Sequence, residues 1–219
     1  MAENQKARAG GADAARQAVM AARRADRRRV FMVWGAVAVI ILSLVGVATK
    51  VLVDASARGE ALKAAVAAPI AGIVKSTPKS ANHVKNLPEP TPTAGVLMPP
   101  VGGDHDAVPQ NCGVYDAPVG TWHAVHSLEH GAVWITYAPG IAAGEVAKLA
   151  AAATNHDHVL VSPFPNLPSP IVLTAWGLQL RVDSASDPRV ETFIKKYENG
   201  PQTPELGAPC SGGVGQPTG

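Results

Sequence analysis

The longest apolar run in the chain lies close to its N-terminus. Val30 to Thr49 covers 20 residues without a charged side chain, and a helix of that length spans about 30 Å, the thickness of a bilayer core. We therefore predict one transmembrane helix over residues 30–53. The apolar region of a cleaved signal peptide is usually about 7–15 residues long, which favours an uncleaved anchor. An A-x-A pattern at residues 55–57 keeps cleavage after Ala57 as the alternative.

The pattern changes twice beyond this helix. Residues 54–97 are first Ala-rich, up to Pro69, and then Pro-rich without a sustained period of 2 or 3.6, which indicates a helical extension followed by a stalk. Shorter periodic segments fill residues 98–212, which we predict to be the exported domain. The chain then ends in a flexible tail at residues 213–219 and begins with a basic tail at residues 1–29.

Regular segments alternate along the predicted domain. Strands are predicted at residues 132–137 and 158–162. Residues 170–176 and 178–183 are predicted as one longer strand or two, with a bulge or bend at Gly177, and helices are predicted at residues 141–153 and 187–197. Ser186 or Asp187 caps the second helix, and Pro188 occupies its first position. This order predicts an α+β fold: a small two-layer sandwich of three or four strands with two helices on one face, behind the single N-terminal transmembrane helix.

The charge is unevenly distributed. Residues 1–29 hold eight basic and three acidic side chains, a net charge of +5, whereas the rest has 11 basic and 14 acidic side chains, a net charge of −3. The positive-inside rule then places the N-terminus in the cytoplasm and the C-terminal domain outside, in a single-pass protein of the cell membrane. Because the basic charge belongs to a tail beside a membrane, we expect no nucleic-acid partner. No phosphate-binding glycine loop occurs, so we expect no nucleotide either.

The two cysteines, Cys112 and Cys210, both follow the transmembrane helix. On the exported side such a pair is usually a structural disulfide bond, which would close a loop of about 100 residues. A pair of thiolate ligands for copper is the alternative.

Histidines and one glutamate are concentrated between residues 121 and 137, in the stretch TWHAVHSLEHGAVWITY. If this segment is helical, His126 and His130 lie on one face at positions i and i+4, where two imidazoles can share a metal ion. His105, in a Gly-rich loop, is the third predicted ligand. Further candidate ligands are His83, Met98, His123 and Glu129.

Copper and zinc both suit imidazole ligands, and a thioether such as that of Met98 would favour copper. The competing interpretation is that the histidines are hydrogen-bonded residues that organise the start of the following strand. If a metal binds, His105 must approach His126 or His130 to within about 5 Å, because metal–nitrogen bonds are only ~2 Å long.

Glu129 raises a second alternative, because H-x-x-E-H is the inverted zincin pattern of metallohydrolases, in which the glutamate activates water. That motif needs a helix which continues past it, whereas Gly131 and a β-type run follow His130. We therefore predict no catalytic residue, with Glu129 as the one candidate if the protein is a hydrolase.

The motifs PPVGGDH (residues 99–105), NCGVYD (111–116) and VHSLEHGAVWITY (125–137) carry a resemblance to a known family. In them the chain resembles a bacterial family of uncharacterised single-pass membrane proteins with an exported domain of unknown function. The similarity runs from about Ala68 to Cys210. It implies an exported domain behind one membrane helix and carries over no activity.

The sequence thus predicts a membrane-anchored domain that binds copper or zinc through His105, His126 and His130, without turnover of its own. An accessory or scaffold subunit of a larger membrane complex, such as a respiratory enzyme, is the alternative from another class.

Overall fold

A computed structural model describes residues 2–93 and 96–218 of the 219-residue chain, with side chains before Val39 described only in part. The chain divides into two compact units between Ala61 and Leu62.

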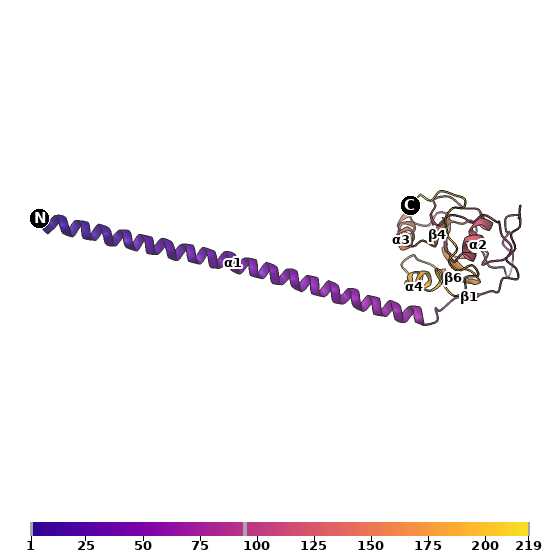
Figure 1. Cartoon of the computed structure of the whole chain (residues 1–219), viewed down its shortest axis with the longest axis horizontal. Helices are drawn as coiled ribbons and strands as arrows, with labels where there is room; N and C mark the ends of the chain where they lie inside the picture. The colour runs from indigo at the N-terminus through magenta and orange to yellow at the C-terminus, as the bar shows by residue number, and fades with distance from the viewer. Residues whose placement is uncertain (1, 94–95, 219) are drawn as a thin grey trace. The chain divides into compact units, whose positions relative to one another are not determined.

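One long helix, α1 (Ala2–Ala67), accounts for the described part of the N-terminal unit, continues six residues beyond its boundary and ends two residues before Pro69 (Figure 1). It includes the basic residues 2–29, for which the sequence predicts only a tail. Within the described side chains, Val39–Ala67 is long and apolar enough to cross a membrane, and the apolar window in it buries none of its residues. Its apolar side chains are exposed, Leu42 by 71%, which is consistent with a lipid-embedded anchor.

The C-terminal unit is built on a mixed sheet that has six strands within the described residues. In spatial order these are β1 (Val74–Lys75), β6 (Leu178–Val182), β5 (Ile171–Ala175), β3 (Val133–Tyr137), β4 (Val159–Pro163) and β2 (Gly113–Val114). β3 and β4 are parallel and are joined by helix α3 (Ala143–Ala153). β5 and β6 are an antiparallel hairpin, turned at Gly177 with a φ of 71°. The longer strands lie where the sequence predicts them.

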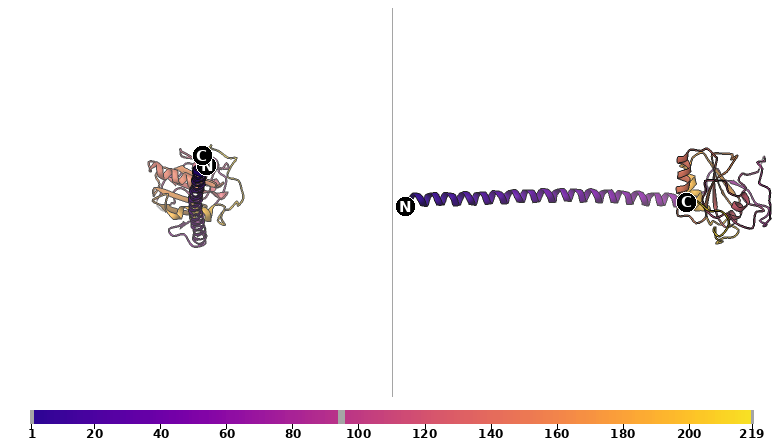
Figure 2. Two further views of the ribbon diagram at one scale, coloured as in Figure 1. Left: turned by 90° about the vertical axis from the view of Figure 1, so that its left-hand side faces the viewer. Right: turned by 90° about the horizontal axis from the view of Figure 1, so that it is seen from above.

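Helices cover both faces of this sheet. α3 and α4 (Pro188–Tyr197) pack on one face against Val133 and Ile135, while α2 (Thr121–Glu129) packs on the opposite face against Trp134. Figure 1 shows α3 and α4 on one side of β4 and β6 and α2 on the other, and Figure 2 gives two further views of the chain. The fold is α+β as predicted, but the sandwich has a third layer.

The extra elements are those whose sequences are too short to show a period. β1 and β2 have two residues each, and α2 has nine, among which polar side chains such as Ser127 and Glu129 are buried. The longer α4 follows its sequence signals closely: Asp187 is the N-cap, its carboxylate accepts a hydrogen bond from the Arg189 amide at 2.9 Å, and Pro188 follows.

Cys112 and Cys210 form a disulfide bond, with their Cα atoms 5.4 Å apart. The backbone beside it is paired as well, because the Cys112 amide donates to the Cys210 carbonyl at 2.8 Å and the Thr218 amide donates to the Val114 carbonyl at 2.7 Å. The sequence predicts a flexible tail at residues 213–219. In the part of it that the structure describes, the Val214 amide donates to the Pro109 carbonyl and the Thr218 amide to the Val114 carbonyl. An oxidised pair in the C-terminal unit is consistent with an exported domain.

The disulfide should contribute strongly to stability. Replacing both cysteines by alanine in the compact unit of residues 62–219 should lower the free energy of unfolding by about 4–5 kcal/mol, because the bond closes a loop with a sequence separation of 98. Urea unfolding followed by tryptophan fluorescence measures this. Reduced wild-type protein is the matched comparison and should show the same loss. A loss below about 1 kcal/mol would contradict the prediction.

Candidate metal centre

A glycine loop and a short backbone ladder position His105. Gly102 and Gly103 have φ values of 143° and 112°, and a Cβ on Gly102 would lie 2.6 Å from Pro78. The loop therefore requires glycine at residue 102. After it, the His105 amide donates to the Asn82 carbonyl at 3.0 Å and the Val84 amide donates to the His105 carbonyl at 2.8 Å. This pairing brings His83 and His105 side by side, with ring centroids 5.1 Å apart.

The C-terminal end of α2 supplies the other side of the site. His126 and Glu129 lie in its last turn, His130 is its C-cap, and Gly131 with a φ of 102° turns the chain into β3. His126 and His130 are neighbours, with ring centroids 4.5 Å apart. The i, i+4 spacing thus places two imidazoles together although the helix ends at Glu129.

Four side chains from these segments converge, and we refer to them as the inner group: His83, His105, His126 and Glu129. One ligand atom from each lies within 4.8 Å of the others. His105 is fully buried, His126 and Glu129 are each 4% exposed, and the His83 side chain is 46% exposed. Three of the four side chains in the group are therefore buried, and the fourth, His83, reaches solvent.

Backbone carbonyls determine which ring nitrogen of each buried imidazole acts as the hydrogen-bond donor. Nδ1 of His105 lies 2.8 Å from the Gly103 carbonyl oxygen, Nδ1 of His126 2.7 Å from that of Asp106, and Nδ1 of His130 2.8 Å from that of Pro209. A carbonyl oxygen only accepts, so each Nδ1 carries the proton and each Nε2 of a neutral ring presents a lone pair. This is the usual outer hydrogen bond of histidines that bind metals.

Burial also keeps His126 neutral. The loss of solvent lowers the pKa of His126 to about 4, against the hydrogen bond to the Asp106 carbonyl, which raises the pKa. A neutral ring at neutral pH is the form that binds a metal ion.

A close contact in the inner group joins His105 Nε2 and Glu129 Oε2, which are 3.0 Å apart. Both atoms are buried, and within the described residues neither has a hydrogen-bond partner, so the approach is close without hydrogen-bond geometry. Across the part of the chain that the structure describes, Glu129 makes its ion-pair contacts with His83 and His105 rather than with lysine or arginine. A buried carboxylate needs compensating charge. Two donor atoms about 3 Å apart are also spaced as two ligands of one ion, given bonds of ~2 Å.

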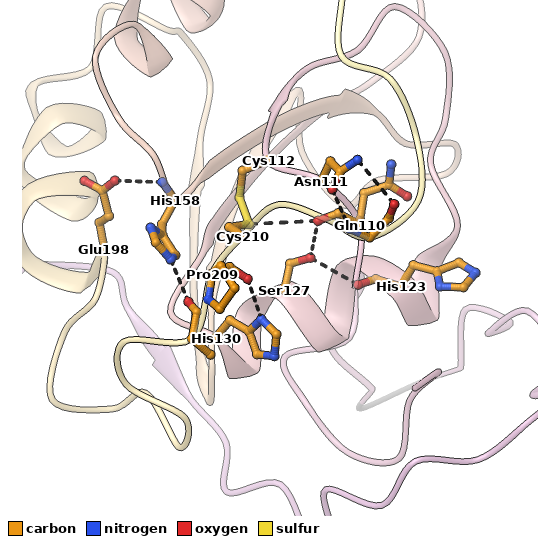
Figure 3. The surroundings of a disulfide bond; sticks show 12 residues. Gln110, Asn111, Cys112, His123, Ser127, His130, His158, Glu198, Pro209 and Cys210 are labelled. Carbon is orange, nitrogen blue, oxygen red and sulfur yellow. Dashed lines mark hydrogen bonds between the residues drawn. A yellow bond between two sulfur atoms is a disulfide. The ribbon is translucent and has the colours of Figure 1, made fainter. Parts of the chain in front are cut away.

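A second set of three side chains, the outer group, shares His126: it comprises His126, His130 and Glu205, again within 4.8 Å. His130 Nε2 lies 3.5 Å from Glu205 Oε2, and the Glu205 side chain is 52% exposed. The segment before Cys210 holds this group in place, because the Glu205 amide donates to the Glu129 carbonyl at 3.1 Å. Figure 3 shows His130 held by the Pro209 carbonyl beside the disulfide.

The predicted ligands are thus divided between two groups. His105 and His126 come together, with ring centroids 4.8 Å apart, and His83 and Glu129 join them. His130 belongs instead to the outer group with Glu205. Glu205 lies in no recognisable motif, so the sequence pattern does not predict it as a ligand.

Two of the additional candidates have other surroundings. Met98 is buried in the apolar cluster of α2 and Trp134. His123 belongs to neither group, and its Nδ1 lies 2.6 Å from the Val108 carbonyl oxygen.

Comparison with known families agrees with the resemblance seen in the sequence motifs. The family described as protein of unknown function (DUF3105) matches residues 93–212. This stretch contains both cysteines and every member of the two groups except His83. No curated protein and no solved structure matches the chain.

Gly131 should be essential to the end of α2. Its positive φ disfavours other residues, and a Cβ there would lie 2.6 Å from Asn199 Oδ1 and 3.1 Å from Asn199 Cα. Gly131→Ala should therefore destabilise the domain by about 2 kcal/mol. Gly144→Ala is the control, because a Cβ in that helical position of α3 meets nothing within 4 Å and should stabilise by up to about 1 kcal/mol. Thermal unfolding of both variants measures this, and equal effects would contradict the prediction.

Proposed function

The chain belongs to the DUF3105 family, proteins of unknown function, and we propose that its C-terminal domain binds one transition-metal ion through the inner group. The observation that carries the proposal is the 3.0 Å approach of His105 Nε2 to Glu129 Oε2, two buried atoms without hydrogen-bond partners in the described chain. A cation between them would satisfy both atoms and neutralise the carboxylate.

The number of ligands favours binding rather than turnover. Three imidazoles and one carboxylate are four protein ligands, the number found in closed zinc sites, whereas catalytic sites keep a position for water or substrate. A hydrolase of the H-x-x-E-H type would also need Glu129 as a base beside the metal. The contact of Glu129 with His105 instead gives it the place of a ligand.

The ion we favour is copper, with zinc as the alternative. The inner group offers nitrogen and oxygen donors, which suit both Cu²⁺ and Zn²⁺. Met98 supports neither, because its burial in the apolar cluster is explained by packing. Copper remains the favoured ion because Cu²⁺ binds a given set of such ligands more tightly than Zn²⁺ does.

Removal of a buried ligand should abolish tight binding. The full-length chain in mild detergent, stripped with EDTA and titrated separately with Cu²⁺ and Zn²⁺, should bind about one ion per chain, and His105→Ala should lower the affinity at least about 100-fold. Bound metal should also raise the melting temperature of the wild-type chain. His123→Ala is the matched control: it removes the same kind of contact with a backbone carbonyl, but from a histidine outside both groups.

Glu129→Gln separates the remaining alternatives. If Glu129 is a ligand, the variant loses affinity; if it is the base of a hydrolase, the variant keeps its metal and loses activity. A wild-type chain that binds neither ion above background would eliminate the metal site and leave an accessory or scaffold subunit with structural histidines.

We further propose that the chain spans the cell membrane once with its N-terminus in the cytoplasm. The net charge of +5 in residues 1–29 precedes the apolar run, and the disulfide belongs to the other side of it. In intact cells or spheroplasts, an added protease should therefore remove a C-terminal tag and spare an N-terminal one. The reverse pattern would contradict the orientation, and loss of the N-terminal segment from the mature chain would indicate cleavage.

A further inference from the structure

Glu205 and His130 have no part in the inner group, yet they stand beside one of its ligands. His126 belongs to both groups, and its ring centroid lies 4.8 Å from that of His105 and 4.5 Å from that of His130. With Nδ1 bonded to the Asp106 carbonyl, His126 has one lone pair, on Nε2, which binds one ion at a time. The two groups are therefore alternatives for this ligand.

The groups also differ in how complete they are. The inner group has four protein ligands, whereas the outer group has three, of which Glu205 is 52% exposed on its side chain. Three ligands leave one position of a tetrahedral ion open to a molecule from solution. An ion in the inner group has to lose a protein ligand before another molecule can bind it.

We propose that His126, His130 and Glu205 form a second, weaker position for a divalent transition-metal ion, and that His126 exchanges the ion between this position and the inner group. The proposal rests on the proposed function, because it assumes an ion in the inner group. The ion enters and leaves through the outer position, where the open site accepts an incoming ligand while His126 still holds the ion.

His130 is oriented for this role by groups outside the inner site. The Pro209 carbonyl accepts the Nδ1–H of His130, and Pro209 precedes Cys210 of the disulfide (Figure 3). The competing explanation is that His130 and Glu205 are only a surface ion pair, since their nitrogen and oxygen are 3.5 Å apart. Metal titration of selected variants separates the two.

The first experiment asks whether the position exists. Full-length chain in detergent is titrated with Zn²⁺ alone. His105→Ala should retain weakened binding of one ion. Adding Glu205→Gln to it should remove the remaining binding, whereas adding Glu191→Gln, a carboxylate outside both groups, should leave it within about twofold. His83→Ala with Glu129→Gln serves as the inner variant if His105→Ala does not fold.

The second experiment asks whether the ion leaves by this route. Zinc-loaded chain is mixed with excess chromogenic chelator, and the rate of zinc loss is followed by absorbance. Glu205→Gln and His130→Gln should slow the loss about tenfold. Glu191→Gln, an exposed carboxylate of α4 outside both groups, should not change it.

The results of the two experiments can contradict the second metal position in three ways. Residual binding that does not depend on Glu205, or an unchanged rate of zinc loss, would overturn the second position and leave an ion pair. Equal losses of affinity in His130→Gln and His105→Ala would make His130 a ligand of the same ion as His105, which also overturns it. A wild-type chain that binds no zinc would instead overturn zinc binding by the inner group, and the exchange of zinc with it.

Discussion

A carboxylate buried against imidazoles is the constraint on which the rest of the domain depends. Glu129 is 4% exposed and contacts histidines where a buried acid would ordinarily need a lysine or arginine. Taking such a charge out of water costs several kcal/mol unless a cation and hydrogen bonds compensate. The glycine loop before His105 and the end of α2 at Gly131 both contain glycines with positive φ, and these two segments bring His105 and Glu129 together. A cation that compensates the charge of Glu129 would therefore also link the loop of His105 to helix α2.

The imidazoles of the centre are oriented by backbone rather than by other side chains. His105, His126 and His130 each donate from Nδ1 to a main-chain carbonyl, so the direction of each lone pair follows the path of a loop. Loops are normally the mobile part of a fold. Here the loop that supplies the carbonyl for His130 is fixed at one end by the disulfide, and the loop that carries His105 is paired with residues 82–84. Preorganisation of this kind would lower the entropic cost of ordering the ligands when an ion binds.

The sequence predicted those parts of the structure that carry a complete local pattern. β3 to β6, α3 and α4 each have a full period or a capping signal, and Asp187 with Pro188 marked the start of α4. The layer formed by α2 was not predicted, because its nine residues place apolar side chains such as Val125 and Leu128 next to buried polar ones such as Ser127, and the mixture shows no clear period. At the site, spacing alone identified His126 and His130 as neighbours. The pairing of His83 with His105 and the approach of Glu205 arise from backbone hydrogen bonds between distant segments, which no local pattern encodes.

The chemistry of the donors is consistent with the side of the membrane on which we place them. Thiolates bind copper and zinc strongly, but they are oxidised readily where disulfides persist. In this chain both cysteines are already joined, and the groups that face one another across the site offer only nitrogen and oxygen. Such donors are not consumed by the oxidants that form the disulfide. On that placement, sulfur holds the scaffold together as the disulfide, and imidazole and carboxylate would be the groups left to bind an ion.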